Sequence, residues 1–291
     1  MKKFNILIAG CGDVGTATAK LLAKNHRVYG LRRSTKTLAN DITAIQADLS
    51  KPETLSQLPD IDIVIYCAAP SNSTQENRIS NYRQTYLTGL SNLLAALKKP
   101  AKHLFFTSST SVYHQHEHQW VDEKSSTQPQ SETARIMLLA EQQVSCDSAS
   151  AATIVRFGGI YSANRLHFFK RVAAGQSYDA NPIQYSNRIH LDDCAGILSH
   201  LVNKLANNVA IAPLYLACDN SPAPLSEVSQ WITQQLQVTP SSVAPSRNTG
   251  SKRCNNRLII ESGYRFIYPS FKEGYRDAVQ QHLQMENIES L

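Results

Sequence analysis

The chain has 291 residues, of which 42% are hydrophobic and 18% are charged, and its net charge at pH 7 is +6. This composition predicts a globular protein with a full core and excludes a disordered chain. Its apolar runs are too short to cross a bilayer, no secretory leader is recognisable, and the six cysteines form no CxxC pair. We therefore expect a cytoplasmic protein with free thiols, without a membrane or nucleic-acid partner.

Strand and helix patterns alternate through the first half of the chain. Short apolar runs predict strands at residues 4–9, 27–31, 42–47, 61–67, 103–107 and 153–156. Helical spacing of apolar residues predicts helices at 14–24, 78–98 and 131–146. Repeated strand–helix units with right-handed connections indicate an α/β fold with a doubly wound parallel sheet of the Rossmann type.

After about residue 157 the pattern changes to loops rich in Gly, Asn and Pro. Helices are expected at 166–175, 192–204 and 224–237, with a strand at 212–217. We therefore expect a Rossmann-type domain over residues 1–157. Residues 158–291 would form a smaller C-terminal substrate lobe that packs on the carboxyl edge of the sheet and is not an independent domain.

A glycine-rich loop, GCGDVG, follows the first strand directly and opens the first helix. Gly10 would make the tight turn, Gly12 would let the backbone approach a pyrophosphate, and Gly15 would allow close packing of helix and strand. Asp13 and Val14 would begin the helix, whose free N–H groups attract anions. The loop predicts a dinucleotide site, so we expect residues 1–157 to form an NAD(P)-binding Rossmann domain.

The second strand ends on two arginines, where NAD-binding proteins place an acidic residue. Arg32 and Arg33 match the 2′-phosphate of NADP, so NADP is favoured over NAD. The alternative is a pair of solvated arginines at a strand end. Asp48 and Leu49 follow the third strand, where such folds often place a carboxylate near the adenine, and the alternative for Asp48 is a helix N-cap.

Six further segments are distinctive: YCAAP at 66–70, TSSTSVY at 107–113, WVDE at 120–123, RFGGIY at 156–161, RIHLDD at 188–193 and KRCNNRL at 252–258. Together with the glycine loop they resemble the extended and atypical short-chain dehydrogenases/reductases, the NAD-dependent epimerase/dehydratase family. The last segment, followed by GYR and YP, resembles the YeeZ-like atypical branch.

The resemblance implies roles for the matching positions. Ser109 aligns with the Ser or Thr that hydrogen-bonds the reacting oxygen of the substrate. The residues that would line the cofactor are Ala68, Ala69, Thr107, Gly159 and Tyr161. The resemblance also implies a small-molecule substrate, and a homodimer that pairs through helices matching 78–98 and 131–146.

One departure from the family pattern concerns its catalytic Tyr-x-x-x-Lys. Counting back from the helical Glu141, the matching positions hold Thr133 and Met137, which cannot act as that acid/base pair. Tyr86 replaces the Asn of the family's Asn-x-x-Gly motif and could present a phenol to the substrate beside Ser109. The alternative is a packed helical tyrosine.

These features leave two functions open. The first is an NADP-binding oxidoreductase or epimerase that acts on a small polar, sugar-like or phosphorylated substrate without the usual Tyr/Lys pair. The second is a non-catalytic NADP-binding regulatory or sensor protein. The sequence HQHEH at 114–118 places three histidines in an expected loop, and we do not predict a functional metal site there.

Overall fold

A computed structural model describes residues 1–34, 38–70, 74, 76–146, 150–245 and 251–289, with side chains through residue 285. The chain is organised as two compact units, each built from separate segments. The first comprises Met1–His114, Ser126–Arg156 and Cys194–Tyr215. The second comprises Gln115–Ser125, Phe157–Asp193 and Leu216–Leu291. The domain boundary expected after residue 157 stays a prediction.

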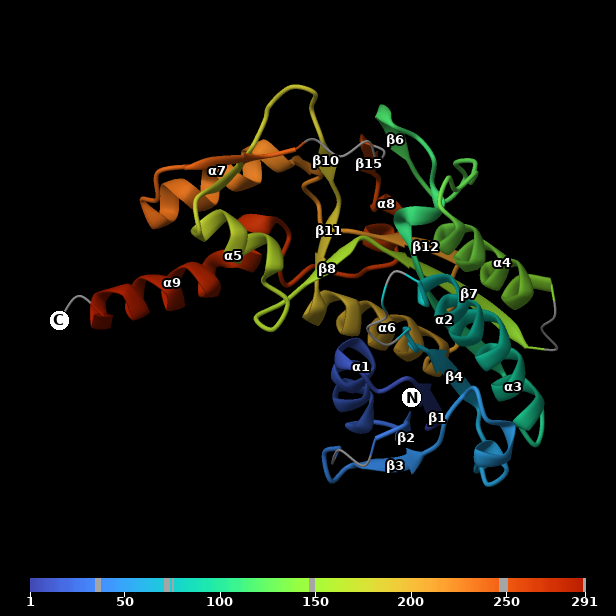
Figure 1. Ribbon diagram of the computed structural model, residues 1–291. Helices are drawn as coiled ribbons and strands as arrows, with labels where there is room; N and C mark the ends of the chain where they lie inside the picture. Colours follow the sequence, from blue (N-terminus) through green and yellow to red (C-terminus); the bar gives the residue numbers. More distant parts are fainter. Residues whose placement is uncertain (35–37, 71–73, 75, 147–149, 246–250, 290–291) are drawn as a thin grey trace. The chain divides into compact units, whose positions relative to one another are not determined.

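The first unit is built on a seven-stranded sheet with the order β12-β7-β5-β4-β1-β2-β3 (Figure 1). Its strands are β1 (Asn5–Ala9), β2 (Arg27–Arg32), β3 (Ile42–Gln46), β4 (Ile63–Tyr66), β5 (His103–Ser109), β7 (Ala151–Phe157) and β12 (Leu214–Ala217). The pairs β2–β3, β1–β2, β1–β4 and β4–β5 are parallel. The expected doubly wound parallel sheet is confirmed.

Strands β1 and β4 are central because their sequences, NILIA and IVIY, are apolar on both faces. Ile6, Leu7, Ile8, Val64 and Ile65 are all fully buried. Parallel strands with helices on both sides read as such continuous apolar runs. The core of this unit therefore lies around β1 and β4. Strands β2 and β3 extend the sheet on one side of this pair, and β5, β7 and β12 extend it on the other.

The helical segments of the first unit are α1 (Asp13–Ala23), η1 (Pro52–Leu55), α2 (Arg78–Arg83), η2 (Gln84–Thr88), α3 (Gly89–Ala96), η3 (Thr110–Val112), α4 (Glu132–Cys146) and most of α6 (Leu191–Ala206). The uninterrupted helix expected at 78–98 contains a π-helical turn, η2. There the hydroxyl of Tyr66 donates to the carbonyl of Thr85 at 2.5 Å. This bond comes from another element, so helical spacing alone could not predict the wider turn.

The second unit has short strands in pairs. Its elements are β6 (Glu117–Val121), β8 (Gly159–Tyr161), α5 (His167–Ala173), β9 (Gln176–Tyr178), β10 (Tyr185–Ser186), β11 (Arg188–His190), β13 (Ala223–Pro224), α7 (Leu225–Leu236), β14 (Ser242–Ala244), β15 (Ser251–Cys254), α8 (Arg257–Glu261) and α9 (Phe271–Glu289). Strands β8–β11, β9–β14 and β6–β15 pair in parallel, and β10–β13 antiparallel. Helices α5, α7 and α9 share a core that includes Phe169, Ile232 and Tyr275.

All six cysteines are free thiols. Cys11, Cys194, Cys218 and Cys254 are buried as expected, whereas Cys146 is exposed at the end of α4. Within the described part of the chain, none of the helices combines the length and apolar character that a membrane span requires.

The buried imidazole of His103 makes the stability of the first unit depend on pH. Its Nε2 lies 2.9 Å from the hydroxyl of Thr153, and burial lowers the pKa of His103 to about 4 from 6.5. The unfolded chain takes up a proton near pH 6.5, but the folded chain does so only near pH 4. Stability contributed by the neutral ring is therefore lost as the pH falls through this range.

We expect the free energy of unfolding to fall between pH 7 and pH 5 by about 2 kcal/mol more in the wild type than in His103→Gln. Urea unfolding of both proteins at the two pH values measures this difference. The same pH dependence in both proteins would contradict the assignment.

Candidate functional site

The loop after β1 passes so close to the end of β4 that only glycine fits. Gly10 has a φ of +98°, and a Cβ atom at this residue would lie 2.4 Å from the Cα and N atoms of Ala68. A Cβ atom at Gly15 would lie 2.3 Å from the carbonyl oxygen of Gly10. Glycine at these two positions therefore allows the loop after β1 to lie against the end of β4, and α1 to lie against that loop.

The residue that precedes α1 has open space beside it. Gly12 precedes the helix, and nothing lies within 4 Å of the position that a Cβ atom would occupy there. Asp13 and Val14 begin the helix, whose first N–H groups have no partners within it. The loop itself is held by two bonds, because the N–H groups of Gly10 and Cys11 both donate to the carbonyl of Leu31 at 3.0 Å. This arrangement can accept an anionic group.

The next two strand ends carry the expected arginines and carboxylate. Arg32 ends β2, and its Nε is buried without a hydrogen-bond partner among the described residues. Arg33 follows it and is exposed. Burial would raise the pKa of Asp48, but hydrogen bonds from Ser50 and the charges of Arg33 and Lys51 lower it. Asp48 is therefore ionised at neutral pH.

Asp48 does not cap a helix, because Lys51 holds the N-cap position of η1. It accepts bonds from the backbone N–H and the hydroxyl of Ser50 at 2.9 and 2.8 Å. The neighbouring Leu49 contributes its carbonyl, which accepts from the side chain of Asn92 at 2.9 Å. These bonds fix the turn after β3.

Ala68, Ala69, Thr107 and Ser109 lie at the ends of β4 and β5. The N–H of Cys67 donates to the carbonyl of Ala9 at 2.8 Å, which carries the β1–β4 pairing up to the loop. Thr107 donates from Oγ1 to the carbonyl of Tyr66 at 3.0 Å. The Oγ of Ser109 accepts from the N–H of Ser111 at 3.2 Å, so its own proton remains available for donation.

Tyr86 lies on η2 and is 7% exposed. Its ring packs between those of Tyr82 and Phe106, with centroid distances of 5.4 and 6.2 Å. Burial raises the pKa of Tyr86 above its usual value, and the nearby Tyr82 and Cys67 raise it further. Tyr86 is therefore a neutral phenol that can donate a hydrogen bond but is a poor base.

The glycine loop, Arg32, Asp48, Ala68 and Ser109 all lie at or just after the carboxyl end of a strand. Because the carboxyl ends of parallel strands lie together, these residues share one edge of the sheet. The chain order reverses between β1 and β4, because β2 and β3 lie on one side of this pair and β5 and β7 on the other. Open α/β sheets bind ligands at such a switch point. Here the glycine loop and Ala68 flank it directly.

The sequence of residues 6–185 matches the model of the NAD dependent epimerase/dehydratase family. The chain belongs to this family. A solved structure from Methylobacillus flagellatus, assigned to NAD-dependent epimerase/dehydratases, is 32% identical and has a TM-score of 0.79. The match covers 97% of this chain and 99% of that one. No match was found among curated proteins.

Two more distant structures share the fold. A UDP-glucose 4-epimerase is 18% identical, with a TM-score of 0.80 and coverage of 97% of this chain and 98% of that one. The human epimerase family protein SDR39U1, solved with NADPH, is 17% identical, with a TM-score of 0.74 and coverage of 95% and 99%.

Helix α4 carries Thr133 and Met137, the residues that the resemblance matches to the family's Tyr and Lys. Met137 is buried and Thr133 is half-buried. One turn further along α4, the carboxylate of Glu141 accepts from Arg156 at 3.0 and 2.6 Å and from the hydroxyl of Ser108. Although burial would lower the pKa of Arg156, the hydrogen bonds and charge of Glu141 raise it.

Arg156 also donates to the hydroxyl of Tyr113 at 2.9 Å. The buried network therefore joins β5, α4, β7 and the segment after η3. This network was not predicted from the sequence. A charged residue inside the apolar segment TIVRF does indicate a buried partner, because arginine is almost never fully buried unless it is paired.

Gly159 and Tyr161 lie on β8 of the second unit. The N–H of Gly159 donates to the carbonyl of Asn187 at 2.8 Å. The ring of Tyr161 packs against Tyr275, with a centroid distance of 4.8 Å, and its buried hydroxyl has no hydrogen-bond partner among the described residues. Burial raises the pKa of Tyr161. A Cβ atom at Gly274 would lie 1.8 Å from this hydroxyl.

The histidines at 114–118 do not converge. His118 lies 2.9 Å from the hydroxyl of Ser251, and His116 lies 3.9 Å from Glu117. Across the described residues, no group of three or more His, Cys, Asp or Glu side chains is arranged to hold a metal ion.

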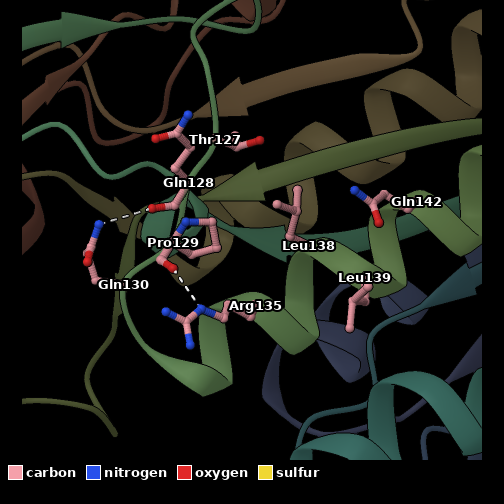
Figure 2. A pocket seen from close by; sticks show the side chains of 8 residues that line it. All are labelled: Thr127, Gln128, Pro129, Gln130, Arg135, Leu138, Leu139 and Gln142. Carbon is pink, nitrogen blue, oxygen red and sulfur yellow. Dashed lines mark hydrogen bonds between the residues drawn. The ribbon is translucent and has the colours of Figure 1, made fainter.

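A separate depression of about 550 Å³ lies beside α4 (Figure 2). It is lined by the segment Thr127, Gln128, Pro129 and Gln130 and by Arg135, Leu138, Leu139 and Gln142 of α4. The Nε of Arg135 donates to the carbonyl of Pro129 at 3.2 Å and closes one side. None of the expected cofactor residues lines this depression.

Proposed function

We propose that the protein is an NADP-dependent oxidoreductase or epimerase that acts on a small polar, sugar-like or phosphorylated substrate. The observation that carries this proposal is the glycine loop at the switch point, with Arg32 and Arg33 at the end of the next strand. The loop leaves open space at Gly12, and the buried Nε of Arg32 lacks a partner among the described residues. Both features fit a phosphorylated dinucleotide.

In this proposal the N–H groups of Gly12, Asp13 and Val14 hold the pyrophosphate. Arg32 and Arg33 hold the 2′-phosphate, which NAD lacks. The human SDR39U1 structure contains NADPH, and a UDP-glucose 4-epimerase from Thermus thermophilus contains NAD, so proteins of this fold bind either cofactor. Arg32 and Arg33, at the strand end where NAD-binding proteins place an acidic residue, support NADP here.

Asp48, Leu49, Ala68, Ala69 and Thr107 would line the adenosine and the ribose next to the nicotinamide. Gly159 and Tyr161 would lie beside the nicotinamide. The bound cofactor would supply or accept a hydride. Ser109 would donate its hydroxyl proton in a hydrogen bond to the reacting oxygen of the substrate.

Tyr86 would serve as a neutral phenol that donates to the same oxygen. Thr133 and Met137 leave α4 without a phenolate–lysine pair, so the proton that follows the hydride needs another donor. Tyr86 is neutral at pH 7 and can donate its hydroxyl proton in a hydrogen bond, but its raised pKa makes it a weaker acid than an ordinary tyrosine.

The alternative is a non-catalytic NADP-binding regulatory or sensor protein. The same absence of a tyrosine and a lysine at positions 133 and 137 supports it. Such a protein would keep the cofactor half of the site and lose turnover. The two functions predict the same cofactor binding and differ in whether any substrate is converted.

We also propose a homodimer that pairs through α2, α3 and α4. Two exposed aliphatic residues, Ile79 on α2 and Leu139 on α4, are 45% and 46% exposed. α2 packs against α4, and Arg83 pairs with Glu132 between them at 2.6 Å. The depression beside Leu139 would receive side chains of the second copy.

For the cofactor, we expect NADPH to bind more tightly than NADH, and Arg32→Gln and Arg33→Gln each to weaken NADPH binding by about tenfold to a hundredfold. Neither variant should change the affinity for NADH. Calorimetric titration measures both. Arg257→Gln, which removes an exposed arginine paired with Glu261, is the control. An equal loss for NADH and NADPH would contradict the role of the arginines.

For the chemistry, we expect Tyr86→Phe to lower the turnover of NADPH by about a hundredfold, within the usual range for loss of a catalytic acid. NADPH affinity should stay the same. The measurement is NADPH oxidation with whichever compound of a sugar and sugar-phosphate panel is turned over. Unchanged turnover would assign Tyr86 to packing alone. Intact cofactor binding with no turnover of any compound would support the sensor function.

For the assembly, we expect Leu139→Asp to raise the dimer dissociation constant by about thirtyfold or more, since it places a charge in an apolar contact. Light scattering coupled to gel filtration measures the mass. Ile260→Asp is the control, because Ile260 is 44% exposed on α8 of the second unit. A wild type that stays monomeric at high concentration would contradict the dimer.

A further inference from the structure

The second unit contains a buried carboxyl group that has no part in the proposed cofactor site. Asp219 follows β12 and is 2% exposed. Its Oδ1 accepts from the N–H of Ser221 at 3.0 Å, whereas its Oδ2 is buried and has no hydrogen-bond partner among the described residues. The backbone N–H of Asp219 donates to the carbonyl of Arg188 at 2.7 Å. The carboxyl group is therefore held away from water with one of its oxygens unpaired.

An ionised Asp219 would be a costly charge inside the second unit, because a buried carboxylate needs several donors or a close cation. Burial, with further effects of the charges on Asp193 and Glu273, raises the pKa of Asp219 to about 7. The hydrogen bond from Ser221 and the charge of Arg188 act in the opposite direction. The protonated form of Asp219 is therefore well populated near neutral pH.

The guanidinium of Arg188 is engaged with other groups. It donates to the hydroxyl of Ser186, and its central carbon lies 5.0 Å from the centroid of the Phe168 ring. Arg188 also lowers the pKa of Tyr275 through a hydrogen bond and its charge, although burial raises that pKa. Its positive charge is therefore shared among several partners.

Asp219 lies beside the contact between β8 and the first turns of α9. The ring of Tyr161 on β8 packs against that of Tyr275, and its hydroxyl lies where a Cβ atom of Gly274 would be. Burial raises the pKa of both phenols, and the charge of Asp219 raises it further. The next residue, Asn220, donates its N–H to the carbonyl of Pro269, just before α9, at 2.9 Å. The charge state of Asp219 therefore acts on the packing of this helix.

We propose that protonation of Asp219 keeps α9 packed against β8, and that loss of this proton as the pH rises favours local opening of the helix. The protonated carboxyl adds no charge to the contact. The carboxylate regains water only when α9 moves away, and it is repelled by Glu273 on the same helix. Glu273 stays ionised, because the hydroxyl of Ser270 donates to it at 2.5 Å and lowers its pKa.

The sign of the pH dependence follows from the two states. In the open state the carboxyl of Asp219 would titrate near its ordinary pKa of 3.8, and in the packed state it titrates at about 7. Stability from the bound proton is fully present below pH 3.8 and is lost as the pH rises through about 7. His190, whose pKa is lowered by burial, acts in the opposite direction, because its neutral ring loses stability as the pH falls. All of these residues belong to the second unit, so the inference does not rest on the proposed cofactor function.

Hydrogen exchange followed by mass spectrometry tests the opening of α9 in the full chain. Protection factors correct for the intrinsic effect of pH on exchange. We expect those of the amides at residues 271–279 to fall by about tenfold or more between pH 5 and pH 8. In Asp219→Asn, which has nearly the same shape and cannot ionise, they should change little over this range. A wild type without this dependence, or the same dependence in Asp219→Asn, would overturn the proposal.

The matched control is Glu261→Gln, which makes the same change at an exposed carboxylate of the second unit and should keep the pH dependence of the wild type. Infrared spectroscopy tests the proton itself. At pH 6 the wild type should show the C=O band of a protonated carboxyl group that Asp219→Asn lacks. In the wild type alone, this band should disappear with a midpoint near pH 7. A carboxyl group that is already fully ionised at pH 6 would contradict the proposal even if Asp219→Asn failed to fold.

Discussion

The contact between Gly10 and the end of β4 is the constraint on which the rest of the first unit depends. A side chain at Gly10 would overlap the backbone of Ala68, so the loop can lie against β4 only with glycine there. The approach lets two N–H groups of the loop share the carbonyl of Leu31. It thereby places the N-terminus of α1, with its partial positive charge, beside the switch point, where it can attract an anionic ligand.

The buried ion pair of Glu141 and Arg156 organises the other half of this sheet edge. Taking both charges out of water is costly, and the bonds from Ser108 and to Tyr113 offset that cost by using the remaining donors and acceptors. The pair fixes α4 against β5 and β7. With Met137 buried on the same helix, this part of α4 contributes packing and internal hydrogen bonds.

Much of the first unit could be predicted from the sequence, and the reasons are local. The runs NILIA and IVIY are apolar throughout, and the spacing of three glycines is set by one backbone geometry. The strands of the second unit could not be predicted, because segments such as SKRC are short and polar and are held by side chains distant in sequence. Asn187 is an example: its side chain bonds to the backbone of both Lys252 and Cys254.

The candidate site divides in the same way. Gly10 and Asp48 follow strands and Arg32 ends one, so position along the chain was enough to place them at the edge of the sheet where the strands end. The surroundings of Tyr86 could not be predicted from the sequence. They depend on the π-helical turn η2 and on the rings of Phe106 from β5 and Tyr82 from α2. The network around Arg156 needs residues from four segments to be close in space, and only its buried charge was visible in the sequence.

The first unit is built from three separate segments of the chain, so its sheet cannot be completed until the last of them has been synthesised. Most of α6 and the edge strand β12 (Leu214–Ala217) are synthesised after β7 (Ala151–Phe157). Until they arrive, β7 is an unpaired edge with a row of free backbone groups and an apolar sequence, which is a template for pairing with other chains. Nascent chains that stop between residues 157 and 214 are therefore the ones that depend most on protection from aggregation.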